Sequence, residues 1–102
     1  MPHKNSDDSE ELHHLYEIVD KVDYDVFKYG ISSDPISKKD GMSKRMRVQL
    51  RLANLIDNWN RFFARILIRD IEGRREAKRI ETEYIQTYKE KHGQRPRGNL
   101  KD

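Results

Sequence analysis

Cysteine is absent from the 102-residue chain. Disulfide bonds and thiolate metal sites are therefore excluded, and the redox compartment of the protein stays open. Long apolar runs are also absent, and the first ten residues, MPHKNSDDSE, are polar and acidic. These features predict neither a cleavable signal peptide nor a membrane span, so we expect a soluble chain without a membrane partner.

The length fits one small domain with a modest core. Only 34% of the residues are hydrophobic and 38% are charged, but the apolar residues form periodic runs between residues 12 and 88. This pattern predicts a single folded domain over residues 12–102. Residues 1–11 are predicted to be a flexible acidic leader.

Charge is distributed unevenly along the chain. Residues 1–25 contain two basic and eight acidic side chains, whereas the remaining residues contain nineteen basic and ten acidic ones. A positive field over the later part suits a polyanionic partner, of which nucleic acid is the commonest. A solvated surface rich in lysine and arginine explains the same charge equally well.

Two β-prone runs open the domain, LHHLYEIVD (12–20) and VFKYGIS (26–32), and the short gap between them predicts an antiparallel hairpin. A loop punctuated by Pro35 and Gly41 follows, and Ser43 is placed to cap the next helix. The apolar stripe of that helix comprises Met46, Leu50 and Ala53, with Leu52, Ile56 and Trp59 beside it.

A third strand is predicted at RFFARILIR (61–69), where Phe62, Ala64, Ile66 and Ile68 alternate onto one face. A last helix follows Gly73 and runs to about Lys91, with a stripe of Ala77, Ile80, Tyr84 and Tyr88. The order strand, strand, helix, strand, helix predicts an α+β fold. We expect a small, three-stranded, mostly antiparallel sheet flanked by helices.

Several polar residues occupy positions from which they could form a site. Tyr16 shares a strand face with His14, and Arg45 and Gln49 are one helical turn apart. Glu81 lies at the margin of the last apolar stripe, so its carboxylate is expected to face the sheet. A phenol, a guanidinium and a carboxylate are the groups needed for metal-assisted attack on a phosphodiester, although spacing alone does not bring them together.

Structural explanations compete with each of these assignments. A glutamate on a basic helix commonly forms a salt bridge there, and the neighbours of Glu81 are Arg74, Lys78 and Arg79. His13 and His14 point to opposite strand faces, which argues against a shared zinc ion. Gly30 fits either a close backbone approach or a simple bulge. Phe27 and Tyr29 are expected to share a face with Ile31 and to pack there.

The two strands carry motifs that resemble those of the GIY-YIG nuclease superfamily. His14-Leu15-Tyr16 corresponds to the first tripeptide, with the tyrosine kept, and Lys28-Tyr29-Gly30 corresponds to the second. The aromatic residue before the second motif is Phe27, so the family's second tyrosine is displaced.

The resemblance continues through the later elements and covers about residues 12–100. Arg45 in SKRMRVQ matches the arginine of the family's first helix, and Gln49 falls where many members have a histidine. Glu81 in AKRIETEYI matches the helix glutamate, and PRGN (96–99) resembles the closing Pro-x-x-Asn.

The resemblance implies a metal-dependent endonuclease of low sequence specificity that hydrolyses phosphodiester bonds in nucleic acid, more readily in DNA than in RNA. One Mg²⁺ or Mn²⁺ ion would be held by Glu81. Tyr16 would deprotonate or orient water and Arg45 would hold the phosphate. Further catalytic support is expected from His14 and Asn99, and substrate contacts from Lys28, Tyr29, Gly30 and Gln49.

Such minimal modules also resemble the nuclease domains of bacterial toxins. A toxin would be delivered into a target cell and paired with an immunity protein, whereas other members would act in the cytoplasm. The alternative is a catalytically inactive domain of the same fold that binds nucleic acid or protein; the displaced tyrosine and Gln49 favour this alternative.

Overall fold

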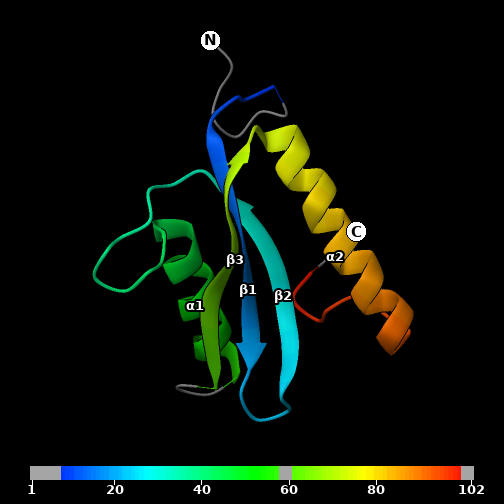
Figure 1. Ribbon diagram of the computed structural model, residues 1–102. Helices are drawn as coiled ribbons and strands as arrows, with labels where there is room; N and C mark the ends of the chain where they lie inside the picture. Colours follow the sequence, from blue (N-terminus) through cyan, green and yellow to red (C-terminus); the bar gives the residue numbers. More distant parts are fainter. Residues whose placement is uncertain (1–7, 58–60, 100–102) are drawn as a thin grey trace.

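The computed structural model describes residues 8–57 and 61–99. Its elements are β1 (Leu12–Asp20), β2 (Asp25–Ser32), α1 (Lys44–Asp57), β3 (Phe62–Glu72) and α2 (Arg74–His92). The strands form one antiparallel sheet in the order β2-β1-β3, and α1 and α2 lie on opposite sides of it (Figure 1). The predicted α+β fold and element order are confirmed. In the described part of the chain, neither helix has the length and apolar character needed to cross a membrane.

Side-chain alternation along β1 builds a separate core on each face of the sheet. Tyr16 packs with Met46 of α1, whereas the preceding Leu15 packs with Ala77 of α2. All four side chains are inaccessible to solvent. Because both faces are covered, the position of each strand residue decides which helix its side chain meets.

An extra residue in β2 changes the predicted face of Phe27. The register passes from Ile18 opposite Lys28 to Val19 opposite Val26, which leaves Phe27 as a bulge. A bulge reverses the alternation, so Phe27 and Tyr29 pack in clusters on opposite faces. The prediction that these two side chains share a face is therefore wrong.

The same effect corrects the predicted stripe of β3. Tyr16 lies opposite Ile66 but Leu15 lies opposite Ile68, so Leu67 is the extra residue. Ile66 therefore packs on the α1 side and Ile68 on the α2 side. The predicted common face is correct from Phe62 to Ile66 and wrong for Ile68.

The α1 stripe of Met46, Leu50 and Ala53 contacts the sheet as predicted. Leu52 is 49% exposed, so its predicted packing beside that stripe is wrong. Ile56 and Trp59 were also predicted to pack beside that stripe, but their side chains are not among those that the structure describes.

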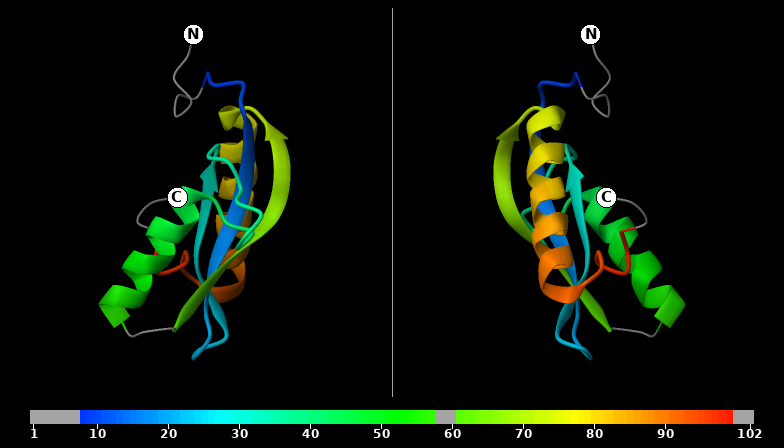
Figure 2. Two further views of the ribbon diagram at one scale, coloured as in Figure 1. Left: turned by 90° about the vertical axis from the view of Figure 1, so that its left-hand side faces the viewer. Right: turned by 90° about the vertical axis from the view of Figure 1, so that its right-hand side faces the viewer.

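The α2 stripe of Ala77, Ile80, Tyr84 and Tyr88 packs against the sheet as predicted. The helix ends where Gly93 adopts the left-handed conformation (φ 80°) and its amide donates to the carbonyl of Lys89 at 2.8 Å. Beyond it the chain turns back, and residues 96–99 lie along β2 (Figure 2).

The end of the predicted leader is bound to the start of α2. The carbonyl of Ser9, a buried residue, accepts the amide of Arg74 at 3.0 Å, and the carbonyl of Glu11 accepts that of Gly73 at 3.1 Å. Residues 1–7 of the predicted leader lie outside the described residues.

Candidate active site

Tyr16 lies at the centre of β1, directly opposite Gly30 of the edge strand β2. A Cβ atom added to Gly30 would come within 2.4 Å of both Cζ and Oη of Tyr16. The phenol therefore lies across the glycine backbone, which explains why this position tolerates no side chain. Of the two explanations for Gly30, close approach is correct.

The Tyr16 hydroxyl is buried and has no hydrogen-bond partner of normal geometry among the described residues. Burial raises the pKa of Tyr16, and the Arg45 guanidinium opposes this rise through its charge and through a contact outside normal hydrogen-bond geometry. The negative charges of Glu81 and Asp34 raise the pKa further. The phenol of β1, the guanidinium of α1 and the carboxylate of α2 thus lie within electrostatic reach of one another.

Glu81 of α2 is half-buried. Burial raises the pKa of its carboxyl group, and the positive charges of Arg74, Lys28, Lys78 and Arg45 oppose this rise, in decreasing order. Four cationic side chains from three elements therefore act electrostatically on one carboxylate.

The third basic neighbour on the helix, Arg79, forms ion pairs with Glu76 and Glu83 on the outer face of α2. Arg79 is therefore not an ion partner of Glu81. Arg74 and Lys78 do act on Glu81, and their spacing of seven and three residues before it is the signal in the sequence that indicates this.

Lys28 and Gln49 connect β2 to α1 beside these groups. The Lys28 ammonium donates to the Gln49 side-chain oxygen at 2.8 Å. Burial lowers the pKa of Lys28, as does the charge of Arg45, whereas Glu81 raises it. Because Gln49 is one turn from Arg45, this hydrogen bond holds the two cations on the same side of the site.

His14 lies behind Tyr16, with its ring centroid 6.3 Å from that of the phenol. Its Nε2 atom pairs with the hydroxyl of Ser43 at 2.9 Å, immediately before α1. Burial is the largest cause of its lowered pKa, and Asp34 opposes the shift. His13 instead pairs through Nδ1 with the carbonyl of Glu11. Asp34 and Ser43 have no role in the sequence-based site, and no periodic pattern marks them.

Tyr29 and Asn99 are coupled through the backbone. The Asn99 side chain accepts the Tyr29 amide and donates to the Tyr29 carbonyl, both at 2.9 Å. The Tyr29 ring packs edge-on against Tyr84, at 5.4 Å between centroids, on the sheet face opposite that of Tyr16. Tyr29 and Asn99 therefore influence the site indirectly, because their interactions fix the position of β2.

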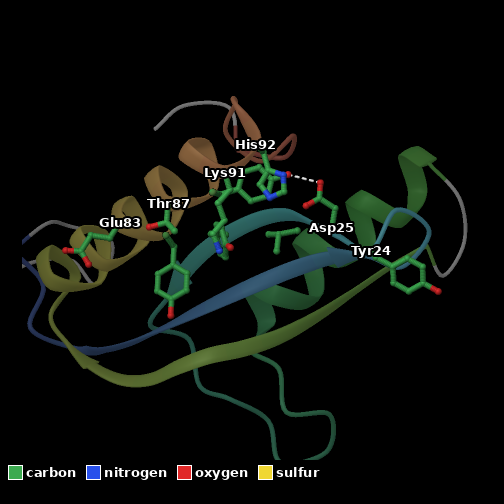
Figure 3. Close-up of a pocket in the computed structure, with 10 residues that line it drawn as sticks. Tyr24, Asp25, Glu83, Thr87, Lys91 and His92 are labelled. Atoms are coloured by element: carbon green, nitrogen blue, oxygen red, sulfur yellow. Dashed lines mark hydrogen bonds between the residues drawn. The ribbon is translucent and has the colours of Figure 1, made fainter.

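A hollow that the structure forms elsewhere contains none of Tyr16, Arg45 and Glu81. It lies between the later part of α2 and the start of β2 (Figure 3), with Tyr29 in its wall, and the Tyr88 hydroxyl donates to Asp25 there at 2.7 Å. The candidate site is instead at the β2 edge.

Within residues 8–57 and 61–99, no group of three or more histidine, aspartate or glutamate side chains is arranged to hold a metal ion. The site nevertheless offers one carboxylate, that of Glu81, within electrostatic reach of the Tyr16 hydroxyl. A hard cation that keeps most of its water ligands needs no more from the protein. The residues thus fit one such ion when a phosphate also contributes oxygen.

A family model described as URI fold toxin 2 matches residues 5–93. The match covers most of the chain, so the protein belongs to this family of toxin domains with a URI fold, which is GIY-YIG-like. Neither a comparison with curated proteins nor one with solved structures finds a match. The family match ends before Asn99.

Proposed function

We propose that the protein is the nuclease domain of a toxin and hydrolyses phosphodiester bonds in nucleic acid, with DNA as the preferred substrate and low sequence specificity. The observation that supports this best is the buried Tyr16 hydroxyl, which has no well-formed hydrogen bond to any described residue and lies within electrostatic reach of Arg45 and Glu81. These three groups come from three elements and match the GIY-YIG motifs. Gly30 makes room for the Tyr16 ring, and Gln49 accepts a hydrogen bond from Lys28. Both contacts are compatible with an intact site.

Each residue has a distinct role in this proposal. Arg45, whose side chain is exposed, binds the scissile phosphate through its fork of N–H donors. In its phenolate form, which the Arg45 charge favours, Tyr16 accepts a proton from the attacking water. The water oxygen bonds to phosphorus, the bond from phosphorus to the leaving sugar oxygen breaks, and that oxygen takes up a proton from solvent. Lys28 adds positive charge beside Arg45. His14 orients Tyr16 from behind.

Glu81 is the residue that would hold Mg²⁺ or Mn²⁺, together with oxygen atoms of the phosphate. Such an ion stabilises negative charge on the phosphate and on the leaving oxygen when bound. The chain itself supplies this carboxylate from α2. For a toxin, we also infer an immunity protein as partner and delivery into a target cell as its route.

Cleavage of plasmid DNA and of a structured RNA, with Mg²⁺ or with a chelator, tests the function. We expect metal-dependent strand breaks, lost by at least about 100-fold in Tyr16→Phe and Glu81→Gln. Glu83→Gln, an exposed change on the same helix, serves as the matched control and should retain activity. Binding without cleavage by the wild-type protein under every condition would refute the nuclease and favour the catalytically inactive alternative.

A further inference from the structure

A buried hydrogen bond joins the strand that carries Tyr16 to the beginning of the helix that carries Arg45. The Nε2 atom of His14 pairs with the hydroxyl of Ser43 at 2.9 Å, and both residues are almost inaccessible to solvent. His14 precedes Tyr16 by two positions in β1, and Ser43 precedes Arg45 by two positions at the start of α1. The bond therefore connects the two backbone segments that carry the phenol and the guanidinium of the candidate site.

The Ser43 side chain does not cap α1, although the sequence places it where it could. The Ser43 carbonyl accepts the amide of Arg47 at 3.1 Å, as the residue before a helix does. Among the described residues, its hydroxyl pairs with His14 and not with an amide in the first turn of α1. The hydroxyl that would otherwise stabilise the helix end thus binds β1 instead.

The other interactions at the start of α1 leave its position along the sheet poorly defined. The first turn contains Lys44, Arg45 and Arg47 and no acidic residue, so the helix dipole disfavours the charges there. Met46 packs with Tyr16, but apolar contact has no preferred direction and persists when a helix shifts along its axis. A hydrogen bond is directional and loses its geometry within a displacement of about 1 Å. The bond from Ser43 is therefore the interaction that fixes this end of the helix.

We propose that Ser43 is a positioning residue for phosphodiester hydrolysis, because its hydroxyl, bound to His14, sets where Arg45 lies relative to Tyr16. The inference rests on the proposed function, in which Arg45 binds the scissile phosphate and Tyr16 takes a proton from the attacking water. Ser43 is inaccessible to solvent and touches neither substrate nor water. Because both site residues act on one phosphate and its attacking water, a change in their separation affects the transition state more than substrate binding.

Cleavage kinetics of Ser43→Ala test this role. A displacement of Arg45 by about 1 Å should lower kcat by about 10- to 100-fold, while KM stays near the wild-type value. Ser43→Thr keeps a hydroxyl on the same Cβ atom and should restore most of kcat. A purely structural role of the bond predicts lower stability but an unchanged kcat for the folded protein.

Asn54→Ala is the matched control, because it removes a hydrogen bond between the same helix and the sheet at the other end of α1. The Asn54 side chain accepts the amide of Phe62 in β3 at 2.9 Å. This variant should lose stability to urea as Ser43→Ala does but should keep its kcat. Equal falls in kcat in the two variants, measured at equal folded fraction, would overturn the positioning role.

If Ser43→Ala does not fold, the partner residue provides the test. His14→Gln places an amide near the position of Nε2, whereas His14→Leu has no polar atom there. Both variants lose the imidazole, so the difference between them isolates the bond to Ser43. His14→Gln should retain a kcat at least about 10-fold above that of His14→Leu. Equal kcat values in the two folded variants would contradict the proposal.

A measurement of geometry separates this inference from the proposed function, because it needs no cleavage. In NMR spectra without nucleic acid, nuclear Overhauser signals between the Arg45 side chain and the Tyr16 ring should appear in the wild type, in Ser43→Thr and in Asn54→Ala. They should weaken or vanish in Ser43→Ala, and unchanged signals there would refute the positioning role. If the wild type cleaves neither DNA nor RNA, the proposed function fails, whereas this comparison still decides whether Ser43 positions Arg45.

Discussion

Gly30 and Tyr16 occupy paired positions on neighbouring strands, and the absence of one side chain makes room for the other. Gly30→Ala introduces a Cβ at 2.4 Å from the Tyr16 ring, so the phenol must move. We expect a loss of about 1–3 kcal/mol in the free energy of unfolding, typical of overpacking, together with loss of cleavage. Urea denaturation and the plasmid assay measure the two effects.

The clash requires the Tyr16 ring, so its cost should depend on that ring. In a Tyr16→Leu background, Gly30→Ala should destabilise the protein much less than in the wild type, which a double-mutant cycle measures as a coupling energy. Additive effects of the two changes would show that Gly30 is needed for a reason other than Tyr16.

Arg45 and Tyr16 should also be coupled in titration. Burial raises the pKa of Tyr16 above its ordinary value near 10, and the Arg45 charge limits this rise because it favours the phenolate. Arg45→Gln should therefore raise the pKa of Tyr16 further. Absorbance titration, with Tyr16→Phe used to isolate this phenol among the five tyrosines, measures the shift. An unchanged or lower pKa would place Arg45 away from the hydroxyl.

At the scale of the elements, an asparagine side chain holds the outer edge of each outer strand. Asn99 pairs with the backbone of Tyr29 in β2, and Asn54 of α1 pairs with the backbone of Phe62 in β3, where it accepts the amide at 2.9 Å. Each pair satisfies backbone groups that an edge strand leaves unpaired. The sheet is therefore fixed at both edges, but only the β2 edge carries the candidate site.

Asn99→Ala removes two hydrogen bonds, and we expect a loss of about 1–2 kcal/mol in stability. Its second effect should be local: the Tyr29 amide exchanges with solvent faster, and cleavage falls because β2 carries Gly30 and Lys28. Hydrogen exchange by NMR and the plasmid assay measure these effects.

Asn54→Ala provides the matched control for Asn99→Ala. It should cost similar stability and speed exchange at Phe62, but it should leave the cleavage rate of the folded protein near that of the wild type. Equal losses of activity in both variants would show that the Asn99 pair affects only global stability.

The order of elements was predictable because period-2 and period-3.6 patterns mark each one. The face of the sheet on which each strand side chain lies was predictable only as far along the strand as the bulge. One extra residue, Phe27 in β2 and Leu67 in β3, reverses the alternation, and neither residue type signals a bulge. The assignments of Phe27 and Ile68 failed for this reason, and that of Leu52 failed because α1 covers the sheet with a narrower stripe.

The candidate site was less accessible from the sequence than the fold. Spacing placed Tyr16, Arg45 and Glu81 on separate elements, and only the resemblance selected them together. Their approach depends on the position of β2 at the sheet edge, where Gly30 leaves room, and register of this kind follows from tertiary packing. Asp34 escaped prediction because it lies in a loop without periodicity.

At the scale of the whole molecule, one buried carboxylate connects three distant segments. Asp20, at the end of β1, is inaccessible to solvent and pairs with Arg61 before β3 at 2.8 Å and with Arg97 of the tail at 2.7 Å. It also accepts the amides of Val22 and Asp23 in the hairpin turn. These bonds hold the tail, and with it the Asn99 pair, in place.

The arginine partners and the turn amides hold the pKa of Asp20 far below its usual range, mainly through Arg61. Because the folded-state pKa is depressed, the stability from Asp20 is present above its unfolded pKa near 4 and is lost as pH falls toward the folded value. Asp20→Asn should therefore lower the free energy of unfolding by about 3 kcal/mol at pH 7. It should also flatten the acid-induced loss of stability below about pH 4, which urea denaturation at a series of pH values measures.

Asp23→Asn is the matched control, because Asp23 faces the same two arginines from an exposed position, at 3.2 Å and 3.8 Å. Exposed ion pairs contribute little, so this change should cost no more than about 0.5 kcal/mol and should leave the pH dependence unaltered. If the two variants lose equal stability, or if Asp20→Asn keeps the full acid dependence, the connection of hairpin, β3 and tail does not depend on the buried carboxylate.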